Sequence, residues 1–134
     1  MNPEKERRRN YRYRHGNLSI MVKRTGFRGR FSKPHVVDWM DYNHRGIAFE
    51  STEKYSLAGT LLLDLAISDE KEISISNVMA YVRNIDKRSS RYRYGIEFDY
   101  HANDYMNSDQ VKNSLSDIEL LLKDIFQRIS NVHP

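Results

Sequence analysis

Short segments in which apolar and polar residues alternate follow one another from residue 18 to residue 98. This pattern constrains the fold most strongly, because residues two apart in a strand point to the same face, so each segment would bury one face. No helical pattern separates the segments. Short strands at this spacing predict a mainly β fold, an antiparallel sandwich or a six-stranded antiparallel barrel. The six predicted strands are residues 18–23, 36–40, 46–49, 60–67, 73–82 and 92–98.

The apolar residues change to a helical period near the C-terminus. They step by four and three residues in turn, which places them on one stripe of an amphipathic helix. Ser108 is expected to cap this helix, with Asp109 in its first turn. The stripe would pack against the barrel. The same spacing also suits a dimer seam, so both a monomer and a weak homodimer stay open. The stripe consists of Val111, Leu115, Ile118, Leu122, Ile125 and Ile129.

Three local features interrupt the strands. Residues 41–45 are predicted to form a turn between the second and third strands. The apolar set changes parity around Ser76 and Asn77, which predicts a β-bulge there. The polar stretch from Asn84 to Ser90 is expected to be a loop.

Charge is concentrated at the N-terminus. Residues 1–30 hold ten basic and two acidic side chains, whereas the whole chain carries a net charge of +4. A local basic region indicates a focused anionic partner more than a general coating of nucleic acid. Together with the strand and helix patterns, this charge distribution predicts a single domain with three parts. They are a flexible basic arm (residues 1–16), a barrel (residues 17–105) and a helix (residues 106–130).

Several classes of chemistry find no support in the sequence. The chain has no cysteine for a disulfide or a thiolate zinc site. Its five histidines are scattered without metal-ligand spacing, and neither a nucleophile elbow nor a phosphate-binding loop is present. No apolar run reaches the length of a membrane span. We therefore expect a cytoplasmic protein that is not an enzyme and needs no metal or cofactor. Trp39, Tyr92 and Tyr94 are expected to pack in the core.

The first candidate binding motif is the arginine-rich segment of residues 7–14. Arginine suits bidentate contacts with phosphate and stacking on planar bases. Arg8 and Arg12 lie four residues apart, and further arginines flank them. Charge alone favours a simpler interpretation, a solvated basic tail that attracts phosphate groups without specificity.

The second candidate motif is Asp-x-Asn-x-x-Gly at residues 41–46. Asp41 and Asn43 lie two apart and would project to the same side of a strand. A carboxylate can accept hydrogen bonds from the N1–H and N2–H₂ edge of guanine, and an asparagine amide adds a donor and an acceptor. Gly46 would allow a tight turn or a close approach by a ligand. Taken alone, this motif is more typical of a plain hairpin turn.

The two motifs together resemble the PilZ domain. That family carries Arg-x-x-x-Arg in an N-terminal arm and Asp/Asn-x-Ser-x-x-Gly between its second and third strands. Residues 8–12 match the first motif, and residues 41–46 match the second with Asn43 at the usual serine. The likeness continues in residues 46–49, 57–61 and 94–98, which resemble strands of the family, and it covers residues 6–126.

The resemblance implies a PilZ-like six-stranded barrel that binds the bacterial second messenger cyclic di-GMP. Arg8 and Arg12 would hold its phosphates and guanines, Asp41 and Asn43 would read a guanine edge, and Gly46 would shape the turn. Arg7, just before the first motif, implies that an intercalated pair of ligands is bound.

The expected function is that of a stand-alone receptor whose arm becomes ordered on the ligand and changes the surface shown to an unknown downstream protein. Two alternatives stay open. One is a barrel that binds nucleic acid, the less favoured partner. The other is a ligand-free adaptor that binds proteins through the terminal helix.

Overall fold

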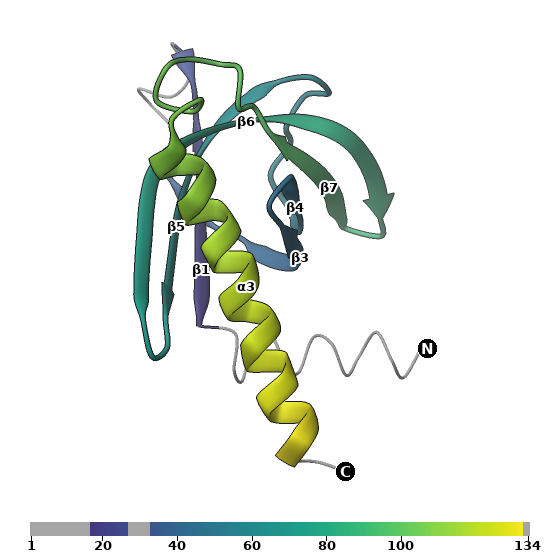
Figure 1. The fold of residues 1–134 in the computed structure, drawn as a ribbon. Helices are drawn as coiled ribbons and strands as arrows, with labels where there is room; N and C mark the ends of the chain where they lie inside the picture. The colour runs from purple at the N-terminus through teal and green to yellow at the C-terminus, as the bar shows by residue number, and fades with distance from the viewer. Residues whose placement is uncertain (1–16, 27–32, 133–134) are drawn as a thin grey trace.

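The computed structural model describes residues 17–26 and 33–132 (Figure 1). Over these residues, seven antiparallel strands form one sheet, and a long helix follows them. The elements are β1 (Leu18–Arg24), β2 (His35–Val36), β3 (Asp38–Asn43), β4 (Gly46–Ser51), β5 (Thr60–Ser68), β6 (Glu72–Arg88), β7 (Arg91–Phe98) and α3 (Asp109–Val132).

The sheet curls into a half-barrel with the strand order β2-β1-β5-β6-β7-β4-β3. Its two outermost strands, β2 and β3, are separated along the chain by Val37 alone. The Val37 amide donates to the Ile20 carbonyl at 3.0 Å, and the Trp39 indole nitrogen donates to the Leu18 carbonyl at 2.9 Å. The two ends of the sheet are therefore held near each other without a ladder between β2 and β3.

The mainly β antiparallel architecture with a C-terminal helix is confirmed, but the count of six strands is wrong for the described residues. The predicted strand at residues 36–40 divides at Val37. The residues before it pair with β1, and the residues after it pair with β4. One run of apolar residues thus serves two strands, which alternation alone does not reveal.

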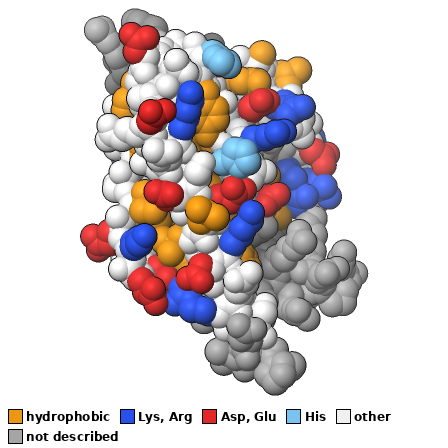
Figure 2. All heavy atoms as spheres, viewed as in Figure 1, with side chains coloured by type: hydrophobic (Ala, Val, Ile, Leu, Met, Phe, Trp, Pro, Cys, Tyr) orange, Lys and Arg blue, Asp and Glu red, His pale blue; other side chains and the backbone are white. Residues whose placement is uncertain are grey.

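Helix α3 covers the open side of the curled sheet and contacts β6 and β3 (Figure 1). All six residues of its predicted stripe are buried. Each buried leucine or isoleucine contributes about 1.5–3 kcal/mol to folding. The stripe therefore packs against the sheet, as expected, and not as a dimer seam. The outward face of α3 intersperses acidic, basic and isolated apolar side chains (Figure 2), among them the exposed Leu120.

Two local predictions are confirmed by the backbone. The Val111 amide donates to the Ser108 hydroxyl at 3.3 Å, which is the expected N-cap. The β5–β6 register shifts opposite Asp64, and Asn77 adopts a φ of 58° at the predicted bulge. The Asn77 amide donates to the Asp64 carboxylate at 3.0 Å, which satisfies a group that the ladder leaves unpaired.

Two other local predictions are corrected. The loop expected at residues 84–90 is wrong, because β6 continues to Arg88 and only Ser89 and Ser90 form the turn. This part of β6 is exposed on both faces, so pairing with β7 holds it without an apolar face of its own. The turn predicted at residues 41–45 is shorter than expected, because β3 runs to Asn43 and leaves two residues before Gly46.

Candidate ligand-binding site

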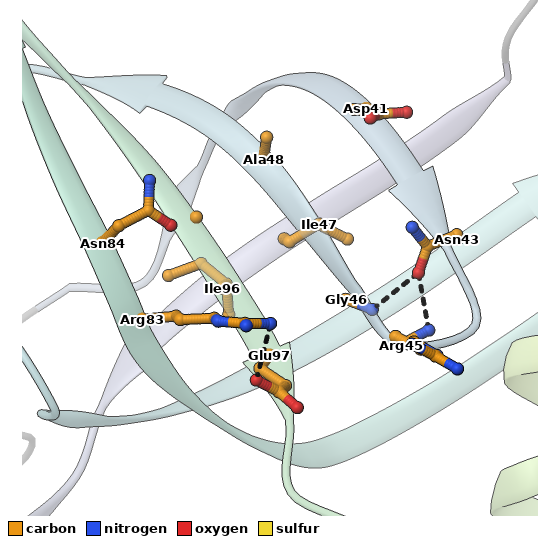
Figure 3. A pocket seen from close by; sticks show the side chains of 11 residues that line it. Asp41, Asn43, Arg45, Gly46, Ile47, Ala48, Arg83, Asn84, Ile96 and Glu97 are labelled. Carbon is orange, nitrogen blue, oxygen red and sulfur yellow. Dashed lines mark hydrogen bonds and ion pairs between the residues drawn. The ribbon is translucent and has the colours of Figure 1, made fainter.

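An open hollow of about 240 Å³ lies on the outer face of the sheet, across β3, β4, β7 and β6 (Figure 3). It brings together the three members of the predicted site that the structure describes, Asp41, Asn43 and Gly46. The other predicted members, Arg7, Arg8 and Arg12, lie outside the described residues with the rest of the arm. The described lining consists of Asp41, Asn43, Arg45, Gly46, Ile47, Ala48, Arg83, Asn84, Gly95, Ile96 and Glu97.

The strand register explains the shape of this hollow. Asp41 pairs with Ala48, Ala48 pairs with Gly95, and Gly95 pairs with Asn84, so these four residues form one row across four strands. We call this the central row. Neighbouring strands lie about 4.8 Å apart, which separates the Cα atoms of Asp41 and Asn84 by about 14 Å. Because the two middle residues are the smallest available, the row has a shallow floor between two polar ends.

Polar residues flank the central row on both sides. One neighbouring row consists of Asn43, Gly46, Glu97 and Tyr81, and the other consists of Asp38, Glu50, Arg93 and Asp86. In the second of these, Arg93 contacts the buried carboxylate of Glu50 at 3.2 Å. The hollow is therefore a flat, uncharged floor surrounded by charged and amide groups, which suits a planar polar ring.

Asp41 and Asn43 project from the same face of β3, as their spacing predicts, since both are exposed while Tyr42 between them is buried. One oxygen of the Asp41 carboxylate accepts the Tyr42 amide at 2.9 Å. This bond orients the carboxylate at the rim of the hollow.

Asn43 stabilises the β3–β4 turn, in addition to the ligand-binding role expected from the sequence. Its Oδ1 atom accepts the backbone amides of Arg45 at 2.7 Å and Gly46 at 3.2 Å, so it closes the β3–β4 turn (Figure 3). A carbonyl oxygen has two acceptor positions. The turn uses both, and Asn43 can therefore offer a ligand its Nδ2 donor but not the acceptor expected from the sequence.

Gly46 is required for a different reason from those suggested by the turn. A Cβ atom at this position would lie 1.9 Å from the Ile96 carbonyl oxygen and 3.1 Å from the Glu97 Cα atom. The glycine lets β4 approach the backbone of β7, and its φ is not in the left-handed region. It therefore fixes the sheet beneath the site.

The β3–β4 turn is fastened to neighbouring elements. The Phe98 amide donates to the Arg45 carbonyl at 2.8 Å, and the Tyr100 hydroxyl donates to the His44 carbonyl. His44 Nδ1 lies 3.1 Å from the Glu119 carboxylate on α3. Burial, with a smaller effect of Glu119, raises the pKa of Tyr100 to about 12, so its hydroxyl stays a donor at neutral pH. The turn is therefore a rigid support for Asn43.

Of the lining residues that could not be predicted from the sequence, Arg83 and Asn84 come from β6, and Asn84 was expected to begin a loop. The β6–β7 register shifts between Val82 and Asn84, and both Arg83 and Asn84 are exposed. The Arg83 guanidinium lies 3.3 Å from the Glu97 carboxylate. A signal was available in Gly95, since a glycine inside an alternating strand often marks a bulge or a close approach.

Other candidate groups have structural roles. Tyr94 is buried and donates to the Glu53 carbonyl at 2.6 Å, while Tyr92 packs against the core and Trp39 is buried. A second hollow lies near Tyr55, whose ring stacks beneath the Arg24 guanidinium at 4.5 Å. Within the described ranges, no group of three histidine or acidic side chains is placed to hold a metal ion. No helix in the same ranges is long and apolar enough to cross a membrane.

Comparison with known proteins gives no further assignment. No protein-family model matches the chain, and no curated protein matches its sequence.

Proposed function

We propose that this chain is a PilZ-like receptor that binds cyclic di-GMP on the outer face of β3, β4, β6 and β7. One observation supports the proposal above all. Asp41 and Asn43, which belong to one of the two motifs, project from one face of β3 onto a hollow with a flat floor. A plain hairpin turn needs no such hollow beside it.

The chemistry of the hollow suits a guanine base. Ala48 has no side chain beyond Cβ, so it leaves a floor on which a planar ring can lie, between Asp41 and the Asn84 amide that covers Gly95. The Asp41 carboxylate at the rim can accept from the N1–H and N2–H₂ groups of guanine, a pair of donors that adenine does not present. Asn43 can add a hydrogen bond through Nδ2.

The negatively charged phosphates of the ligand require cationic side chains. Arg45 and Arg83 line the described part of the hollow. By resemblance, Arg8 and Arg12 supply the main phosphate and guanine contacts, and Arg7 provides a third guanidinium for a second, intercalated ligand. The proposed activity is binding without turnover, and the output is a changed surface for a downstream protein.

Isothermal titration calorimetry of the full chain with cyclic di-GMP tests the proposal. We expect saturable binding, with more than one ligand molecule per chain and no heat from GTP or single-stranded RNA. The Arg8→Ala, Arg12→Ala double variant is expected to lose binding and stay folded. Absence of binding by a chain that circular dichroism shows to be folded would refute the proposal. Binding of RNA instead would favour the nucleic-acid alternative.

The Asp41→Asn variant tests the base contact directly. It keeps the shape of the side chain but replaces one acceptor oxygen with a donor, which faces the guanine donors unfavourably. We expect the affinity to fall by about tenfold or more, since such a loss corresponds to about 1.4 kcal/mol. Asp117→Asn, at an exposed position of α3, is the matched control and should bind like the unmodified chain.

A further inference from the structure

We propose that Asn84 is a second base-recognition residue, which binds the edge of guanine opposite to the edge read by Asp41. This inference rests on the proposed function, because it assigns a further contact to the same ligand. It follows from the position of Asn84 at the far end of the central row, across Gly95 and Ala48 from Asp41 (Figure 3).

A bulge in β6 places Asn84 on this face. Val82 pairs with Ile96 and Asn84 pairs with Gly95, so Arg83 is the extra residue. Gly95 lies between the buried Tyr94 and Ile96 and so belongs to the outer face of β7, and pairing with it places Asn84 on this face as well. Bulges commonly re-aim side chains beside binding sites. Here the bulge turns Asn84 toward the hollow, while Arg83 contacts Glu97.

The side chain of Asn84 lies on the floor of the hollow. The position that a Cβ atom of Gly95 would occupy is 2.0 Å from Asn84 Oδ1, 2.9 Å from Cγ and 3.3 Å from Nδ2. The amide thus fills the space that the glycine leaves. Asn84 is exposed and lines the hollow, so a ligand there can reach its amide.

The separation of the two ends fits one base. The Asn84 amide reaches over Gly95, so about two strand spacings, about 10 Å, separate it from the Cα atom of Asp41. Two hydrogen bonds of about 2.9 Å each fit within this span with one purine between them. If Asp41 accepts from N1–H and N2–H₂, the opposite edge presents the acceptors N7 and O6. Asn84 can donate to one of these acceptors through Nδ2, whereas its Oδ1 finds no donor on this edge.

Titration calorimetry with cyclic di-GMP tests the inference on the full chain. We expect Asn84→Ala to weaken binding by about tenfold, as for the loss of one base contact. Asn84→Asp should weaken it further, because a carboxylate offers no donor to N7 and O6 and repels them. Asn113→Ala, at an exposed position of α3, is the matched control and should not change the affinity.

The outcomes separate this inference from the proposed function. If the unmodified chain binds and both Asn84 variants bind equally well, the inference is overturned and the proposed function stands. If the unmodified chain does not bind, both are overturned. Urea unfolding of each variant accompanies the titration. Asn84→Asp is nearly isosteric, and therefore keeps the test decisive if the alanine variant does not fold.

Discussion

Replacing Gly46 by alanine should lower the free energy of unfolding much more than replacing Gly95. At both positions the added Cβ atom would lie closer to a neighbouring atom than any normal contact. In Gly46→Ala the new Cβ meets the Ile96 carbonyl oxygen at 1.9 Å, and that oxygen belongs to the rigid backbone of β7. The two strands must separate to admit it. In Gly95→Ala the atoms nearest the new Cβ all belong to the Asn84 side chain, which can rotate away.

These contacts determine how much each substitution should lower the free energy of unfolding. Overpacking against backbone costs about 3 kcal/mol, at the upper end of the usual range. The lower entropy of the unfolded chain with alanine offsets about 0.5–1 kcal/mol of this cost. Gly46→Ala should therefore lower the free energy of unfolding by about 2 kcal/mol. Gly95→Ala should lower it by less than about 1 kcal/mol, since only a side chain must move.

Urea denaturation followed by circular dichroism measures both values, and a third variant completes the comparison. Replacing Asn84 and Gly95 together by alanine removes the amide that the new Cβ would meet, so the double variant should be at least as stable as Gly95→Ala alone. No such rescue is available for Gly46→Ala, because its clash is with backbone. Equal losses for the two single glycine variants would refute the reasoning.

Two further predictions concern the helix and the half-buried Tyr100. Ser108→Ala removes the N-cap of α3 and should cost about 1 kcal/mol in urea denaturation, whereas Ser108→Asp should retain most of the stability. The raised pKa of Tyr100 means that the unfolded chain ionises first, so stability should be full below pH 10.0 and fall as the pH rises toward about 12. Tyr100→Phe should make this alkaline loss shallower, and an unchanged slope would contradict the assignment.

Burial explains which parts of the fold could be predicted from the sequence. The strands that line the core alternate because one face must be apolar, and the stripe of α3 repeats for the same reason. The bulge at Asn77 was visible because it shifts a burial pattern from Ile75 to Val78. The end of β6, from Arg83 to Arg88, has no buried face, so its residues carry no such pattern, and a loop was expected from Asn84 onward.

The residues of the candidate site could likewise be predicted only in part from the sequence. The chemistry of Asp41, Asn43 and Gly46 could be predicted to lie together because all three belong to one short segment. Asn84 could not be added to them, because its place depends on strand pairing between distant segments. The use of Asn43 Oδ1 by the turn is likewise a matter of geometry that the residue type does not reveal.

Two register shifts lie beside the floor of the hollow. Together they place Asp41 and Asn84 at the two ends of the central row. The β3–β4 pairing slips between Trp39 and Asp41, and the β6–β7 pairing slips between Val82 and Asn84. Both slips lie beside the same pair, Ala48 and Gly95.

Without these two register shifts, the pairing would continue with Met40 opposite Ala48 and Arg83 opposite Gly95, and these two residues would occupy the ends of the central row. A carboxylate and an amide thus face each other across a flat floor only because both flanking strands bulge at one level. Two bulges at one level give β-hairpins no general advantage in stability, since each leaves a residue unpaired in its ladder. Bulges are frequent both at the rims of barrels and beside binding sites, and the coincidence of two at one level is a structural reason to test this surface for a ligand.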